Sequence, residues 1–447
     1  MKLKIIVAIF FFQNLIIGQL NPEKLSLEDA LIIGLENNTT IRKANKELLK
    51  AYKEKWRTIS IGLPQIKSTI SYQNFIEMPI SLVPAEFFGG NPGEFAEISF
   101  GTEQIANASI KLEQLIFDGT YIVGLQGIKL YLEVAENIKK KTTQQIKKEI
   151  ISAYINSLLS KENVTIIKNN ISKISKNLEE VKSLYENGFN EEENVEQLRL
   201  TLNSLNSNLK YAEKLELILS KMLNLILGID INKKIELTDK LDLLTLKNID
   251  FDEDSKSNNL DFNLDLKIAQ NNVFKKALLH KLEKAKSLPS LSGFISGSYT
   301  GNSNEFSFTE KNQKWFGSSV FGLKIDIPVF SSFGRVANSQ KSKINLEKAE
   351  IELEETKNKV ILNLEKLKNE YSLSIDNYFT AKENLSLARK IEEKNQIKFY
   401  EGLSSSFELR EAQLQLFSSQ SNYLNSMIKV INKKSELDII INSPKKN

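Results

Sequence analysis

The chain has 447 residues, of which 41% are hydrophobic and 26% charged, and its formal net charge is +4. This composition excludes an intrinsically disordered chain, and the length allows two or three ordinary domains. The near-neutral charge gives no argument for a nucleic-acid partner. Because no cysteine is present, disulfides and thiolate metal sites are excluded.

Residues 1–18 have the pattern of a secretory signal peptide. Lys2 and Lys4 form a positive end, residues 5–17 are mostly apolar, and Gly18 is a small residue at which cleavage could occur. A buried first helix is the alternative interpretation. No later run of about 20 apolar residues predicts a transmembrane helix. An exported chain of this kind is soluble, peripheral, or a β-barrel in an outer membrane.

Two helices and two strands are predicted next. A short amphipathic helix over 26–37 has Ser26 as its N-cap, and a second helix over about 40–61 ends near Pro64. Apolar and polar residues then alternate over about 66–76 and again over 104–115, with a Pro- and Gly-rich loop between the two runs. This alternation fits membrane-spanning strands, and it also fits any half-buried strand.

Two long stretches of the chain with almost no glycine or proline predict two very long helices. We predict helices over about 121–187 and 335–401, and at about 1.5 Å per residue each is roughly 100 Å long. The second has apolar residues spaced by three, four and seven, as in helices that pack like coiled coils. That segment alone would equally fit a coiled-coil rod. Return helices over 191–227 and about 404–440 complete two hairpins, with Asn190 as the expected N-cap of the first.

The second half of the chain repeats the plan of the first. After a connector at 229–259, a helix over 262–286 precedes strands at about 291–300 and 319–327. The spacing from Phe117 to Phe330 is 213 residues, and the spacing from Gly188 to Gly402 is 214. This constant offset indicates a tandem duplication. The predicted domains are a first repeat at 19–228, the connector, and a second repeat at 260–447.

Strand number then limits the assembly. Two repeats supply four strands, which cannot close a barrel, and an open sheet edge is not tolerated in lipid. Two copies would give eight strands, whose interior is filled by side chains, whereas three would give twelve and room for water. The predicted fold class is therefore mainly α with a transmembrane β-barrel. We predict a homotrimer whose three copies share a 12-stranded barrel and a coiled-coil-like α-helical tunnel in the periplasm.

The order and spacing of several motifs resemble the TolC-type outer-membrane efflux family over essentially the whole mature chain. The motifs are SLEDALIIGLENN at 26–38, the Leu-Pro pairs at 63–64 and 288–289, LIFDG at 115–119, and the two helical tips. The resemblance implies a trimeric conduit in the outer membrane of a Gram-negative bacterium, contacting lipid there and lacking a cofactor. It also implies docking on a periplasmic adaptor and on an inner-membrane transporter, either a proton-driven pump or an ABC ATPase.

The resemblance further implies functional residues at the tips. Adaptor contact is expected at Gly188 and Phe189 in the first tip and at Gly402 and Leu403 in the second. The tunnel entrance is expected at five positions, of which Asn194 and Ser404 depart from the acidic and basic residues of the family: Asn194, Phe399, Ser404, Glu408 and Glu411. The two glutamates either form acidic rings that favour cations, or are ordinary charges at a helix start and on a solvated face.

The sequence can also be compared with what other functions require. His280 is the only histidine and has no acidic cluster near it in sequence, and no GxxxxGK[ST] loop is present, so we expect neither an enzyme nor a metal site. An exported periplasmic adaptor or scaffold is the main alternative. The outer-membrane component of type I protein secretion is another, and the sequence does not separate it from small-molecule efflux.

Overall fold

The computed structural model describes residues 24–251 and 260–441, so the predicted signal peptide lies outside the described residues. Backbone contacts divide the chain into two compact units. Within the described residues, the helical unit contains 24–46, 137–267 and 357–441, and the sheet unit contains 47–136 and 268–356.

The helices confirm the internal duplication. Helices α2 and α6 have 22 residues each, α4 and α8 have 36 each, and α3 and α7 have 68 and 67. Their bounds, with those of α1 and α5, are α1 Leu27–Asn37, α2 Thr39–Ser60, α3 Gly119–Glu186, α4 Glu192–Leu227, α5 Leu241–Lys247, α6 Leu264–Ala285, α7 Gly334–Tyr400 and α8 Ser406–Ile441. None of the helices in the described part of the chain has an apolar stretch of the length needed to cross a lipid bilayer.

Of the two N-cap residues predicted from the sequence, one is confirmed and the other is wrong. Ser26 caps α1 in a capping box with Asp29, as expected for its first turn. The prediction that Asn190 caps α4 is wrong, because Glu191 occupies the N-cap position without a side-chain bond. The Asn190 side chain instead accepts a hydrogen bond from the adjacent Glu191 amide at 2.9 Å, so the helix begins later.

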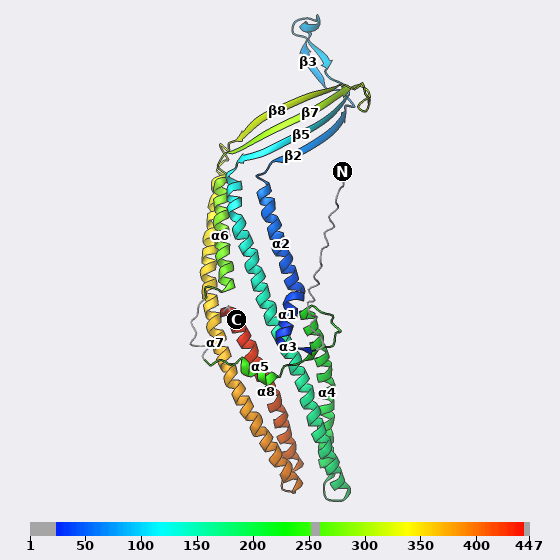
Figure 1. Cartoon of the computed structure of the whole chain (residues 1–447), viewed down its shortest axis with the longest axis vertical. Helices are drawn as coiled ribbons and strands as arrows, with labels where there is room; N and C mark the ends of the chain where they lie inside the picture. Colours follow the sequence, from blue (N-terminus) through cyan, green and yellow to red (C-terminus); the bar gives the residue numbers. More distant parts are fainter. Residues whose placement is uncertain (1–23, 252–259, 442–447) are drawn as a thin grey trace, which may run out of the picture. The chain divides into compact units, whose positions relative to one another are not determined.

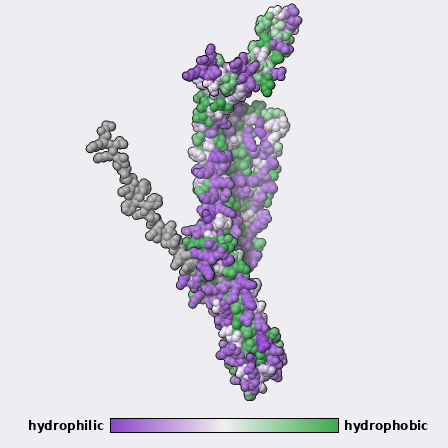
Figure 2. Space-filling model, turned by 90° about the vertical axis from the view of Figure 1, so that its right-hand side faces the viewer, coloured by the Kyte–Doolittle hydropathy of each residue, from purple (hydrophilic) through white to green (hydrophobic). Residues whose placement is uncertain are grey.

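In the helical unit, α3 with α4 and α7 with α8 form two hairpins whose loops lie at the same end (Figure 1). The largest buried cluster combines residues of α1, α3, α4, α5, α7 and α8, including Ile150, Tyr154, Leu227, Leu364 and Ile431. Figure 2 shows hydrophobic residues in a stripe between hydrophilic ones along the lower, helical part of the view. A small parallel pair joins β1 (Lys24–Leu25) to β6 (Glu236–Leu237).

The sheet unit is built on four antiparallel strands in the order β2-β5-β7-β8 (Figure 1). Their bounds are β2 Gln65–Asn74, β5 Gln104–Phe117, β7 Ser290–Ser303 and β8 Trp315–Asp326. Each has at least the roughly 9–11 residues that a membrane-spanning strand requires. The outer strands β2 and β8 each pair on one side only.

The segment between the first two strands differs from the predicted loop. Residues Ile80–Pro84 and Phe95–Ser99 pair as β3 and β4, and a short 3-10 helix, η1, covers Ala85–Phe88. Pro79, Pro84 and the glycines of this region suggested an unstructured connection. Pro84 nevertheless fits at the end of a two-stranded hairpin, where its missing N–H costs no ladder bond inside a sheet.

Candidate membrane sheet and helical tips

One face of the four-stranded sheet is apolar. Ile70, Ala108, Tyr299 and Gly317 form one rung across the strands, and the side-chain period of two places every second residue on the same face. Most of the large apolar side chains of this face are exposed, with Ile70 83% and Phe321 72% accessible. They are Ile66, Ile70, Tyr72, Ile110, Ile295, Tyr299, Trp315, Phe321, Leu323 and Ile325.

The opposite face is mostly polar. Ser71, Asn107 and Thr300 share a rung there, and the Asn107 side-chain amide donates a hydrogen bond to the Thr300 hydroxyl at 2.8 Å. Its large apolar exceptions are Ile105, Leu115, Phe294, Phe316 and Val320. A strand that alternates apolar-out and polar-in suits a wall between lipid and water.

Aromatic residues gather at both ends of this sheet. Near β8's start, the Tyr72 ring lies 5.8 Å from both Phe306 and Phe308, and Phe308 lies 6.2 Å from Trp315. Past the other end, Phe330 and Phe333 contact each other edge-on at 6.2 Å and are both exposed. Girdles of aromatic residues at two interfaces are typical of membrane-spanning sheets.

The two tips share one backbone motif. In the first, the Gly188 amide donates to the Tyr185 carbonyl and the Phe189 amide to the Leu184 carbonyl, and φ of Gly188 is +80°. In the second, the Gly402 amide donates to the Phe399 carbonyl and the Leu403 amide to the Lys398 carbonyl, with the same sequence spacing. The φ angle of Gly402 is +73°. This is the Schellman ending that glycine favours. It leaves the following apolar side chains outside, with Phe189 81% and Leu403 73% exposed.

Glu408 is tied to the start of α8. The Ser404 hydroxyl donates to its carboxylate at 2.5 Å, the Ser405 amide donates to it at 3.2 Å, and the Glu408 amide donates back to the Ser405 hydroxyl at 3.3 Å. The hydrogen bond from Ser404 holds the pKa of Glu408 below its usual value. The carboxylate is fully exposed, so it caps the helix and still presents its charge to solvent.

The other expected entrance residues occupy different surroundings. Glu411 is exposed and lies 3.7 Å from Arg410, whose guanidinium stacks over the Phe407 ring. Asn194 is half-buried and donates to the Asn190 side chain. Phe399 is 9% exposed and packs in a hydrophobic cluster with Val195 and Leu409, which links the two hairpins. The structure therefore brings Ser404 and Glu408 together and places Phe399 in the core.

Sequence reasoning missed a polar contact between the hairpins. Glu392 of α7 is 1% exposed and receives an ion pair from Lys173 of α3 at 2.6 Å. Nearby, Asn177 accepts hydrogen bonds from Gln396 at 3.2 Å and from the Tyr400 hydroxyl at 3.1 Å. Burial raises the pKa of Tyr400 to about 12, so this hydroxyl stays a donor at neutral pH. The available signal was the spacing 385, 388, 392, 396, 399, which places two polar residues on the apolar seam.

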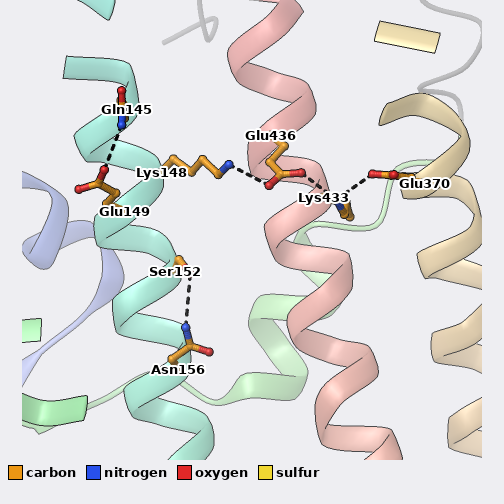
Figure 3. A network of polar contacts seen from close by, with 8 residues as sticks. All are labelled: Gln145, Lys148, Glu149, Ser152, Asn156, Glu370, Lys433 and Glu436. Atoms are coloured by element: carbon orange, nitrogen blue, oxygen red, sulfur yellow. Dashed lines mark hydrogen bonds and ion pairs between the residues drawn. The ribbon is translucent and has the colours of Figure 1, made fainter. Parts of the chain in front are cut away.

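A second polar network joins three helices of the helical unit (Figure 3). Glu436 of α8 pairs with Lys148 of α3 at 2.8 Å and with Lys433 at 2.9 Å, and Lys433 also reaches Glu370 of α7 at 2.8 Å. The hydrogen bond from Lys433 lowers the pKa of Glu370. Hydrogen bonds from Lys148 and Lys433 outweigh burial and lower the pKa of Glu436. The network fixes the side-by-side position of α3, α8 and α7.

The described residues contain no group of three or more His, Asp or Glu side chains that could hold a metal ion. His280 of α6 shares a hydrogen bond of 2.8 Å with the hydroxyl of Ser342 on α7, a role inside the helix packing.

Comparisons with known proteins agree with this architecture. Residues 257–442 match the model of the family described as outer membrane efflux protein. No curated protein sequence matches the chain. Three solved structures share the fold. CusC is 15% identical, with a TM-score of 0.72 over 93% of this chain and 91% of its own. The outer membrane protein VceC of Vibrio cholerae is 14% identical (TM-score 0.70; 93% and 95% covered). The Campylobacter jejuni outer membrane channel CmeC is 16% identical (TM-score 0.72; 93% and 85% covered).

The chain thus has the fold of these outer-membrane proteins, as its sequence predicted. Its predicted second repeat also matches the model of the outer membrane efflux protein family.

Proposed function

We propose that three copies of this chain form a passive conduit across the outer membrane. The two-faced sheet is the observation that carries the proposal, because its apolar face would meet lipid and its polar face would meet water. Three copies of four strands make twelve, enough for an aqueous passage. In this assembly the long helices would wall the periplasmic part of the passage.

The edges of the sheet are compatible with closure. Since successive strands are antiparallel in the order β2-β5-β7-β8, the edge strands β2 and β8 run in opposite directions. Strand β8 of one copy can therefore pair antiparallel with β2 of the next. Each copy would satisfy the unpaired backbone groups of its neighbour, as lipid requires.

The conduit depends on partners for its energy. We propose that the tips around Gly188, Phe189, Gly402 and Leu403 contact a periplasmic adaptor, which connects the conduit to an inner-membrane transporter. Both tips present an exposed apolar residue just after a Schellman glycine, which gives equivalent contact points in the two repeats. The substrates of small-molecule efflux and those of type I secretion would use the same passage, and we favour efflux because the family description names it.

Reconstitution tests the proposal. The mature chain, extracted in detergent and added to planar lipid bilayers, should run as a trimer and give discrete single-channel currents. A chain that stays monomeric in the soluble fraction, without detergent, would instead support the alternative of a periplasmic adaptor or scaffold.

The adaptor contact has its own test. The double variant Phe189→Ser/Leu403→Ser should still form conducting trimers in bilayers but should fail to support export in cells. The matched control is Tyr211→Ser, which removes an apolar side chain that is 70% exposed on α4 away from the loops. Normal export by the double variant would contradict contact at the tips.

A further inference from the structure

The charged residues of the sheet are confined to one face and one end. The four strands contain five charged side chains in all: Lys67, Lys111, Glu113, Lys324 and Asp326. Lys67 and Lys111 are direct partners across β2 and β5. The register through β7 places Lys324, opposite Ser292, on the same face, and the Lys111 ammonium lies 5.2 Å from the centre of the Phe294 ring. All five lie at the end of the sheet that leads into the helices of the sheet unit.

Charge pairing within this group is incomplete. Lys111 pairs with Glu113 at 3.0 Å, and Lys324 pairs with Asp326 at 2.8 Å. Lys67 is exposed and has no hydrogen bond or ion pair within the described ranges. It also lies directly opposite another lysine, an arrangement that disfavours strand pairing. Three lysines against two acids leave a net charge of +1 on this face of each chain.

The same group borders an open cavity of 630 Å³ between the sheet and the adjoining helices. Lys67, Lys111 and Lys286 line it together with Glu113 and Asp118. The Asp118 carboxylate accepts hydrogen bonds from the Thr120 hydroxyl and the Tyr121 amide at the start of α3, so its charge is set against the positive end of that helix. The space beside the lysines is accessible to a hydrated ion.

We propose that these residues form a lysine band that selects small anions in the passage, an inference that rests on the proposed conduit. In a trimer the band would carry a net charge of +3, and a low-dielectric wall concentrates such a field in the water beside it. If Lys67 meets Asp326 of the adjacent copy where β2 and β8 pair, the net charge is unchanged.

Reversal potentials in a KCl gradient test the band. The double variant Lys67→Gln/Lys111→Gln leaves one lysine against two acids, so the trimer's net charge on this face changes from +3 to −3. We expect the ratio of chloride to potassium permeability to fall several-fold, on the order expected when the sign of a local field reverses. The matched control Lys67→Arg/Lys111→Arg keeps the charge and should keep the wild-type ratio.

The single variant Lys67→Gln guards against a folding defect. It removes an exposed, unpaired side chain and the like-charge opposition to Lys111, so trimer formation should be preserved while the ratio falls by a smaller amount. An unchanged ratio in both glutamine variants would overturn the lysine band while leaving the conduit standing. Absence of any current from the wild-type protein would overturn the conduit and the band together.

Discussion

At the scale of single residues, Tyr154 shows how one hydroxyl group joins distant parts of the chain. Tyr154 is fully buried. Its hydroxyl lies within hydrogen-bonding distance of two acceptors, the Leu25 carbonyl at 2.9 Å and the Asp239 carboxylate at 2.7 Å. Asp239 also accepts from the Leu27 amide at the start of α1. Burial, with Asp239 nearby, raises the pKa of Tyr154. The hydroxyl therefore remains protonated and ties the N-terminal segment to the connector.

Replacing this hydroxyl should weaken the helical unit. Tyr154→Phe leaves the half-buried Asp239 carboxylate with one donor fewer, and we expect a loss of about 1–3 kcal/mol in the free energy of unfolding. Chemical denaturation in detergent measures it, with the exposed Tyr211→Phe as control. Equal stability of the two variants would contradict the role of Tyr154.

Glu411 separates the two interpretations of the acidic entrance. Glu408 also caps α8, so its replacement changes helix stability as well as charge. Glu411 is exposed and its partner Arg410 lies 3.7 Å away, so Glu411→Gln changes mainly charge. If the acids form cation-favouring rings, this variant should lower the ratio of potassium to chloride permeability in single-channel recordings. An unchanged ratio would make Glu411 an ordinary surface charge.

At the scale of elements, the ion pairs in Figure 3 give the helical unit a defined pH dependence. The pKa values of Glu370 and Glu436 are lowered from 4.5 in the folded protein. Their pairing therefore stabilises the fold above about pH 4.5, and this contribution is lost as the pH falls through the lowered pKa values. The pKa of Lys433 is raised from 10.5, mainly by the hydrogen bond to Glu370, so its contribution is lost at strongly alkaline pH.

Removing Lys433 should flatten the acid side of this dependence. We expect the melting temperature of Lys433→Met, followed by circular dichroism, to change less than that of the wild type between pH 6 and the acid range below 4.5. Lys390→Met, at an exposed position of α7, should keep the wild-type slope. Identical acid profiles for all three proteins would show that the network contributes nothing measurable.

Two helix-ending glycines differ in what surrounds them. Gly228 has φ of +72°, and a Cβ there would lie 2.4 Å from the Asn37 carbonyl oxygen. Gly402 has φ of +73°, but nothing lies within 4 Å of its Cβ position. Gly402→Ala should cost about 1–2 kcal/mol from the left-handed backbone alone. Gly228→Ala should lower the free energy of unfolding by clearly more, as measured by chemical denaturation in detergent. Equal losses for the two variants would contradict the close approach of Gly228 to Asn37.

At the scale of the whole molecule, the sequence predicted the elements better than the contacts between them. Glycine and proline placed the ends of α3 and α7 within two residues, and alternation located all four strands of the sheet. The hairpin of β3 and β4 was missed because its strands are short and follow Pro79. The burial of Phe399 and the pairing of Glu392 with Lys173 depend on two hairpins meeting, which a local pattern does not encode.

The proposed conduit requires that neighbouring copies complete one barrel through β2 and β8. Because the chain has no cysteine, introduced pairs can be cross-linked without background. We would combine Ile70→Cys with cysteine at Ser319, Phe321 or Leu323 in turn, since barrel strands are staggered, and add a bismaleimide to the trimer in detergent. The control joins Ala108 and Tyr299, which are direct partners within one chain. A shared barrel predicts covalent dimers and trimers and nothing larger from at least one β2–β8 pair, and only monomers from the control. Monomers alone from every β2–β8 pair, with an efficiently cross-linked control, would contradict the shared barrel.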